Sequence, residues 1–149
     1  MNERGIQKRL YWNIGHGRAY AMVNVHVFCN ESDFLTVTKN GYVDEYEIKI
    51  SRSDFLRDFG KSRHISYKDP SQYPESRFPN RFWFVVPDGL MSIDETPDYA
   101  GLIYCHDNGA TPVVKPAPML HRNKDGEFVT EKLLVSAYHR FWSKVLYEA

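Results

Sequence analysis

This 149-residue sequence has few cysteines, no long hydrophobic run and no net charge. Its two cysteines, Cys29 and Cys105, are too few for a disulfide framework, so we expect two free thiols. No stretch approaches the roughly 18 apolar residues that a membrane-spanning helix needs. The first residues, Met1 to Arg4, lack the apolar core of a signal peptide. These absences predict a cytoplasmic protein with no membrane partner.

The charges balance, because 19 basic residues stand against 19 acidic ones. A net charge of zero excludes a protein held to nucleic acid by bulk positive charge alone. Hydrophobic residues make up 42% of the chain and aromatic residues 15%, which favours a folded chain over a disordered one. The length suits one domain, and no repeat or linker divides it. We therefore expect a single domain over residues 1–149.

The apolar patterning predicts helices at both ends of the chain and strands between them. Asn2 is the expected cap of a first helix that reaches Ile14, and a short helix is expected from Arg52. The Asn40-Gly41 pair predicts a two-residue hairpin turn, because both positions tolerate positive φ. Strands are expected at residues 21–28, 34–38, 42–50, 81–87, 100–105 and 111–115, with a long loop at 61–79. This order predicts an α/β fold with a mixed central sheet flanked by helices.

A last helix is expected from about Thr130. Apolar pairs recur every four residues along it: Leu133/Leu134, Ala137/Tyr138, Phe141/Trp142 and Val145/Leu146. Such a broad stripe is typical of a helix face that packs on a core. We interpret it as core, the alternative being a dimer seam at Phe141 and Trp142.

The hairpin carries the most informative chemistry. Side chains alternate along residues 42–50, so Glu45, Glu47 and Lys49 share one face. Pairing about the Asn40-Gly41 turn brings Asp33 to the same end of the hairpin as Glu47 and Lys49. Carboxylates beside a lysine at a strand end suit a hard cation such as Mg2+. The alternative is a surface charge ladder between the strands.

These residues carry a family resemblance. Asp33, followed 14 positions later by Glu47-Ile48-Lys49, resembles the signature of the PD-(D/E)XK nuclease superfamily, although Ser32 replaces the proline of the strict pattern. Three blocks, residues 31–42, 47–55 and 81–90, are similar to MmcB-like DNA repair proteins and related phage and bacterial proteins. The resemblance spans roughly residues 31–118. It implies a restriction-endonuclease-like fold, with the whole chain forming one nuclease-like domain.

The resemblance also implies roles for individual residues. Asp33 and Glu47 would bind Mg2+ or Mn2+ through their side chains, with the Ile48 carbonyl as a third ligand. Lys49 would position the attacking water. The implied activity is metal-dependent hydrolysis of DNA in repair or phage DNA processing. Auxiliary roles would fall to the nearby acidic residues Glu31, Glu45 and Asp54.

The charge distribution agrees with a phosphodiester substrate. Residues 31–47 hold five acidic residues and one lysine, whereas residues 49–81 hold eight basic and four acidic residues. A basic segment beside an acidic metal site is what DNA binding needs. Tyr67 and Tyr73 are candidates for stacking on unpaired bases, or for ordinary packing. The candidates for phosphate contacts are Arg52, Lys61, Arg63 and His64.

Two other functions stay open. The same fold can serve as a catalytically silent module that binds nucleic acid or protein, which the zero net charge favours. The second open function is an enzyme whose carboxylate-rich site acts on small phosphorylated metabolites. The presence of Asp33, Glu47 and Lys49 together favours the enzyme. Besides DNA, the expected partners are a second copy of the chain or a larger repair or phage complex.

Overall fold

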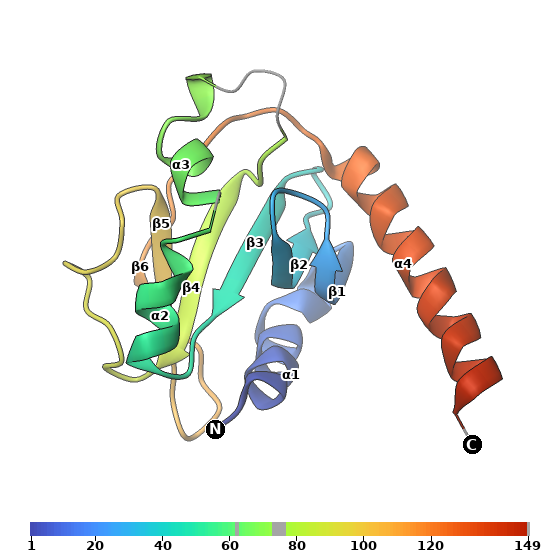
Figure 1. The fold of residues 1–149 in the computed structure, drawn as a ribbon, viewed down its shortest axis with the longest axis horizontal. Helices are drawn as coiled ribbons and strands as arrows, with labels where there is room; N and C mark the ends of the chain where they lie inside the picture. The colour runs from blue at the N-terminus through green and yellow to red at the C-terminus, as the bar shows by residue number, and fades with distance from the viewer. Residues whose placement is uncertain (62, 73–76, 149) are drawn as a thin grey trace.

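A computed structural model describes residues 1–61, 63–72 and 77–148 of the chain. Its centre is a six-stranded mixed sheet (Figure 1). The strands are β1 (Tyr20–His26), β2 (Glu31–Val37), β3 (Val43–Ile48), β4 (Arg81–Pro87), β5 (Ala100–Cys105) and β6 (Val113–Lys115). The helices are α1 (Glu3–Asn13), α2 (Arg52–Asp58), α3 (Arg63–Lys68) and α4 (Gly126–Tyr147), with short 3-10 turns at Gly15–Gly17 and Pro70–Gln72. The predicted class, an α/β fold with a mixed sheet flanked by helices, is confirmed.

The strands lie in the sheet in their sequence order. β1, β2 and β3 form an antiparallel meander, β4 and β5 continue parallel to β3, and β6 returns antiparallel to β5. A parallel pair needs a crossover connection, and α2 and α3 provide it between β3 and β4. This crossover sets both helices beside the end of β3, where Glu47 and Lys49 lie.

Each face of the sheet is covered by a different helix layer. On one face, Ile6 and Leu10 of α1 pack against Phe34, Tyr46 and Trp83 of the sheet. Phe55 of α2 and Tyr67 of α3 belong to a second cluster with the sheet residues Phe82, Phe84 and Leu102. Since β3 alternates, the side chains of Glu45 and Glu47 point to the α2/α3 side, away from Tyr46 and Ile48. The acidic residues therefore lie on a covered face of the sheet.

Local signals in the sequence account for several elements. The side chain of Asn2 accepts a hydrogen bond from the Gly5 N–H at 2.8 Å and caps α1 as predicted. Gly41 has a φ of +88°, but Asn40 does not have a positive φ and Thr38 bonds to Tyr42, so the hairpin closes with a three-residue loop, residues 39–41, and the predicted two-residue turn is wrong. Ser51 caps α2 by accepting from the Asp54 N–H. Cys29 and Cys105 are both free thiols, as expected.

Three expectations need correction. Within the segment predicted to be one long loop, residues 63–68 form α3, because the buried Arg63 side chain and Tyr67 fix this turn of chain on the sheet. Strand β2 starts at Glu31, so Asp33 lies inside it. Helix α4 starts at Gly126 rather than near Thr130. Tyr73, a candidate for base stacking, lies outside the described residues.

The apolar stripe of α4 is not core, so that interpretation is wrong. Val129 and Leu133 pack against Leu35, Val37 and Val43, but the side chains from Leu134 to Tyr147 are largely exposed. The helix contacts β1 and β2 through its first turns and then extends away from the sheet (Figure 1). Among the described residues, no helix combines the length and apolar character that crossing a membrane requires.

Candidate functional site

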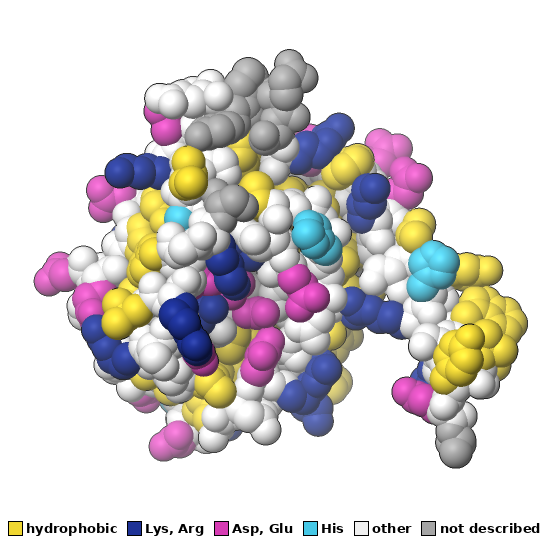
Figure 2. All heavy atoms as spheres, in the orientation of Figure 1, with side chains coloured by type: hydrophobic (Ala, Val, Ile, Leu, Met, Phe, Trp, Pro, Cys, Tyr) yellow, Lys and Arg dark blue, Asp and Glu magenta, His cyan; other side chains and the backbone are white. Residues whose placement is uncertain are grey.

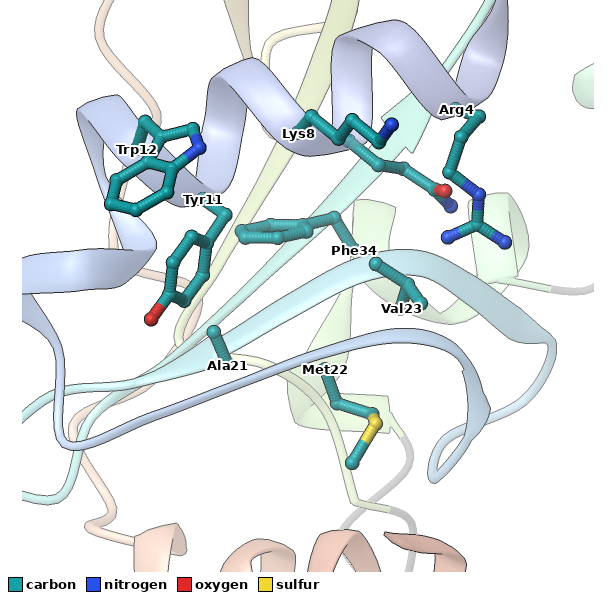
Figure 3. A pocket seen from close by; sticks show the side chains of 9 residues that line it. Arg4, Lys8, Tyr11, Trp12, Ala21, Met22, Val23 and Phe34 are labelled. Carbon is teal, nitrogen blue, oxygen red and sulfur yellow. The ribbon is translucent and has the colours of Figure 1, made fainter. Parts of the chain in front are cut away.

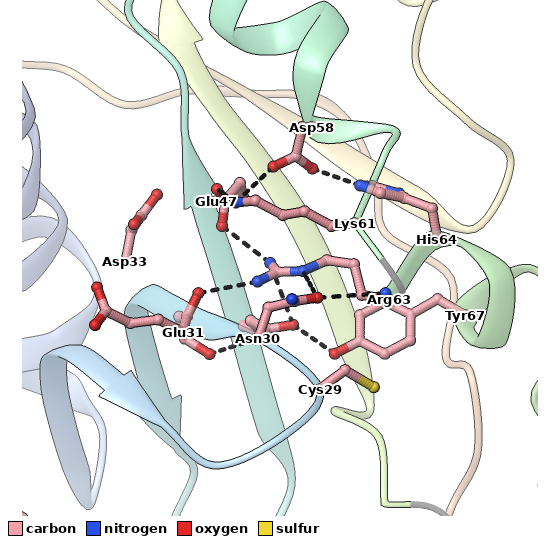
Figure 4. Close-up of polar contacts among 12 residues, drawn as sticks. Cys29, Asn30, Glu31, Asp33, Glu47, Asp58, Lys61, Arg63, His64 and Tyr67 are labelled. Carbon is pink, nitrogen blue, oxygen red and sulfur yellow. Dashed lines mark hydrogen bonds and ion pairs between the residues drawn. The ribbon is translucent and has the colours of Figure 1, made fainter.

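The structure brings Asp33 and Glu47 together at one end of the β2–β3 pair (Figure 4). Phe34 pairs with Tyr46 across these strands, so Asp33 and Glu47 are the next residues toward that end. The Asp33 carboxylate accepts a hydrogen bond from the Ile48 N–H at 2.8 Å. The N–H and C=O of a strand residue point to the same side, so the Ile48 carbonyl also faces β2. The three groups predicted as ligands share one corner of the sheet.

Asp33 has no cationic partner among the described residues' ion pairs. Burial and then the neighbouring Glu47 raise the pKa of its carboxyl group to about 8. Gln7 of α1 holds the backbone here, because its side-chain amide donates to the Asp33 carbonyl at 2.9 Å and to the Asn24 side chain at 3.0 Å. A carboxylate fixed in place without a compensating charge is one that a bound cation would stabilise.

Glu47, in contrast, is surrounded by cations. Its Oε1 lies 2.9 Å from the Lys49 ammonium and 2.8 Å from that of Lys61. Its Oε2 accepts a hydrogen bond from the Arg63 guanidinium at 2.9 Å. Figure 4 shows Lys61, from the segment before α3, and Arg63, from α3, reaching Glu47 of β3. Both carboxylate oxygens are therefore engaged within the chain.

Asp58 of α2 is a member of this cluster that the sequence analysis missed. Its Oδ1 lies 2.9 Å from both Lys49 and Lys61, and its Oδ2 contacts the His64 ring. Burial alone would raise the pKa of Asp58, but the contacts with His64, Lys49 and Lys61 outweigh it and hold that pKa well below its usual value. The available signal was spacing, since Asp58 follows the buried Phe55 by three residues on the same helix face.

The side chain of Arg63 is fully buried and connects several elements of the site. Besides Glu47, its guanidinium donates to the Glu31 carbonyl at 2.9 Å and to the Asn30 side chain at 3.3 Å. It also lies over the Phe82 ring at 5.4 Å from the ring centre. These contacts tie α3 to β3 and to the start of β2.

The phosphate contacts predicted for Arg63 and His64 do not hold in this arrangement. Both side chains are buried, and His64 is bonded to Asp58 on one side and to the Tyr99 hydroxyl, at 2.6 Å, on the other. Of the four candidates, Lys61 and Arg52 reach the surface. Arg52 is paired there with Glu95, at 2.6 and 3.0 Å.

The predicted auxiliary acids have different positions. Glu45 is fully buried and accepts hydrogen bonds from Tyr67, at 2.7 Å, and Ser32, so it is a structural group with no access for a ligand. Burial raises the pKa of Glu45. Asp54 is exposed and pairs with Arg57 on α2. Glu31 is the remaining candidate, because it is exposed and lies close to Asp33.

Two hollows adjoin the N-terminal part of α1. An acidic cleft of about 720 Å³ is lined by three carboxylates, Glu3, Glu31 and Asp33, and by one cation, Arg4. An apolar groove of about 300 Å³ lies between α1 and β1, with Arg4 and Lys8 on its rim (Figure 3). The groove has no carboxylate in its lining, so the candidate cation chemistry belongs to the acidic cleft.

The donor set fits a hard divalent cation. Among residues 1–61, 63–72 and 77–148, no three His, Cys, Asp or Glu side chains form a metal site. Asp33 and Glu47 supply two carboxylates, and the Ile48 carbonyl a third oxygen, which is the chemistry that Mg2+ and Mn2+ prefer. Asp33 lacks a positive partner, so an ion there would relieve the cost of its burial. Access to Glu47 Oε1 requires Lys61 to move aside.

No protein-family model matches the sequence, and no curated protein matches it. One solved structure is similar, that of a protein of unknown function from Silicibacter pomeroyi. The two chains are 19% identical with a TM-score of 0.67, and the match covers 98% of this chain and 90% of the other. This similarity shows a shared fold along nearly the whole chain.

Proposed function

We propose that the protein is a metal-dependent nuclease that hydrolyses a phosphodiester bond of DNA, in the cytoplasm, in repair or phage DNA processing. The observation that carries this proposal is the Asp33 carboxylate. It is held in place by the Ile48 N–H, has a pKa raised to about 8 by burial, and lies beside Glu47. A structural charge ladder would pair this group with a cation, whereas a metal-binding site leaves it available.

The residues around Asp33 have separate roles in this proposal. Asp33, Glu47 Oε1 and the Ile48 carbonyl would hold Mg2+ or Mn2+, which supplies a more acidic bound water and polarises the phosphate. Arg63 fixes Glu47 through its other oxygen, Oε2, so that Oε1 is the oxygen that would bind the ion. The Lys49 ammonium, 2.9 Å from Oε1, is placed to orient a water and to balance the charge that builds up on the phosphate.

Lys61 is the residue whose ion pair with Glu47 would break when the cation binds. Its side chain is 36% exposed and flexible, whereas the Arg63 side chain is fully buried. Cation binding and the Lys61–Glu47 ion pair therefore compete for the same carboxylate oxygen. Once displaced, Lys61 adds a positive charge next to the site where the DNA backbone would lie.

The catalytically silent module remains the second candidate. It is favoured by the three cations, Lys49, Lys61 and Arg63, that already contact both oxygens of Glu47. In that case the cluster would serve stability, and the protein would bind nucleic acid or another protein without a metal ion.

Titration calorimetry with Mn2+ separates the two candidates. The nuclease proposal expects Mn2+ binding that Asp33→Asn abolishes, because the amide keeps the bond to Ile48 but loses the charge. Lys61→Ala should tighten binding by freeing Glu47 Oε1. Arg57→Ala is the matched control, since it removes an exposed cation that pairs with Asp54 only. Absence of Mn2+ binding by the wild-type and Lys61→Ala proteins would contradict the proposal and favour the silent module.

A further inference from the structure

The exposed face of α4 carries a continuous set of hydrophobic side chains. Figure 2 shows hydrophobic side chains gathered on the part of α4 that stands clear of the body. Isolated exposed apolar residues are ordinary, but a contiguous set on one helix indicates an interaction surface. We call this set the α4 stripe: Leu134, Val135, Tyr138, Phe141, Trp142, Val145 and Leu146.

The α4 stripe faces away from the sheet. Val129, Leu133 and Arg140 form the inner face of the helix, since the first two are buried and Arg140 bonds to the Asn24 carbonyl of β1. At 3.6 residues per turn, the centre of the row that contains Phe141 and Tyr138 lies about 130° around the helix from that inner face. Rotating α4 down onto the sheet would therefore not bury the stripe, so its partner comes from outside the chain.

The size of the stripe matches half of a stable interface. Its residues are between 43% exposed (Trp142) and 63% exposed (Leu146). With about 150–250 Å² for a large side chain, the stripe exposes roughly 700 Å² in total. Specific dimers bury about 600–1,000 Å² on each partner. Two copies of the stripe therefore offer enough area for an interface of ordinary size.

We propose that two copies of the chain dimerise by pairing their α4 stripes in antiparallel orientation. Glu127 and Glu131 lie at the N-terminal end of the exposed face, and Lys144, three residues after Phe141, flanks the stripe in the C-terminal half of the helix. Antiparallel pairing directs the acidic end of each helix toward the half of its partner that carries Lys144, and a two-fold axis relates the copies. The spacing of Leu134, Tyr138, Phe141 and Val145, by four, three and four residues, is typical of paired helices.

Sedimentation equilibrium of the full chain over a wide concentration range tests this dimer. We expect a species of twice the 17.4 kDa chain mass, and a Phe141→Glu variant whose dissociation constant is at least about thirtyfold higher. Ser143→Glu is the matched control, because it places the same charge on α4 outside the stripe and should leave the dimer intact. Far-UV circular dichroism verifies that both variants keep their helix content.

Trp142 provides an independent readout. In a Trp12→Phe background, the remaining tryptophans are the buried Trp83 and Trp142 in the stripe. Dilution should shift the emission to the red as the dimer separates, and Phe141→Glu should abolish the concentration dependence. A wild-type protein that is monomeric at every concentration, or a Phe141→Glu variant that dimerises as tightly as wild type, would overturn the proposal.

Discussion

Replacing Arg63 by methionine tests whether the cluster around Glu47 is held by a buried cation. Methionine keeps an unbranched apolar side chain but removes the guanidinium. The Glu47 Oε2 and the Glu31 carbonyl, each 2.9 Å from it, then lose their donor. Glu45, whose carboxylate lies 3.8 Å from the same guanidinium, loses its nearest cation. Two buried carboxylates are left undercompensated.

The remaining contacts of Glu47 determine how much stability Arg63→Met should cost. Removing one partner from a buried ion pair costs about 3–5 kcal/mol. Glu47 keeps Lys49 and Lys61 at its other oxygen, so we expect the lower end, about 3 kcal/mol. In a chain of this length, that loss lowers the melting temperature by roughly 6–12 °C. Arg57→Met, which removes an exposed cation, should cost less than about 1 kcal/mol.

Urea denaturation of a double-mutant cycle measures the coupling. If Arg63 stabilises the fold by neutralising Glu47, then Arg63→Met with Glu47→Gln should be less destabilised than the sum of the two single variants. The neutral amide needs no cation, so part of the penalty disappears. The reasoning is refuted if Arg63→Met costs less than about 1 kcal/mol or if the two substitutions are simply additive.

Three further predictions concern neighbouring parts of the molecule. Folding raises the pKa of Asp33 from 3.8 to about 8, so the folded state binds more protons than the unfolded state in that range. In the presence of a chelator, the free energy of unfolding should therefore fall as the pH rises from about 4 to 8. Urea titrations at several pH values should show a smaller fall for the Asp33→Asn variant. Lys49→Met should keep Mn2+ binding in calorimetry yet lose DNA cleavage, because it leaves both carboxylates in place but removes the ammonium group that orients the water. Unchanged turnover would contradict that role. Gly101→Ala should lower the melting temperature by the equivalent of about 1–3 kcal/mol, since the added methyl group would overlap the Trp83 ring and the Ala117 side chain.

Local signals in the sequence predicted the elements that local interactions determine. Asn2 caps α1, and Gly41 adopts a positive φ in the hairpin loop, because each effect acts over a few residues; the loop itself is one residue longer than predicted. The alternation on β3 correctly placed Glu45, Glu47 and Lys49 on one face. The hairpin register then brought Asp33 beside Glu47, which is why the carboxylate pair could be predicted from spacing.

Contacts between distant segments were beyond such reasoning. The bond between Arg63 and Glu47 joins residues 16 positions apart through the crossover, and no periodicity signals it. For the same reason the sequence favours phosphate contacts for Arg63 and His64, although packing of α3 buries both. The α4 stripe was interpreted as core because an amphipathic pattern shows that a face needs a partner without showing whether that partner lies in the same chain.

Cleavage of DNA by the purified protein tests the central claim most directly. Single-stranded, duplex and branched substrates would each be incubated with Mg2+, with Mn2+ and with EDTA, and with the Asp33→Asn variant in parallel. The account predicts products that require the metal ion and disappear in Asp33→Asn. Products that persist in EDTA or in Asp33→Asn would contradict it, as would intact substrates under every condition.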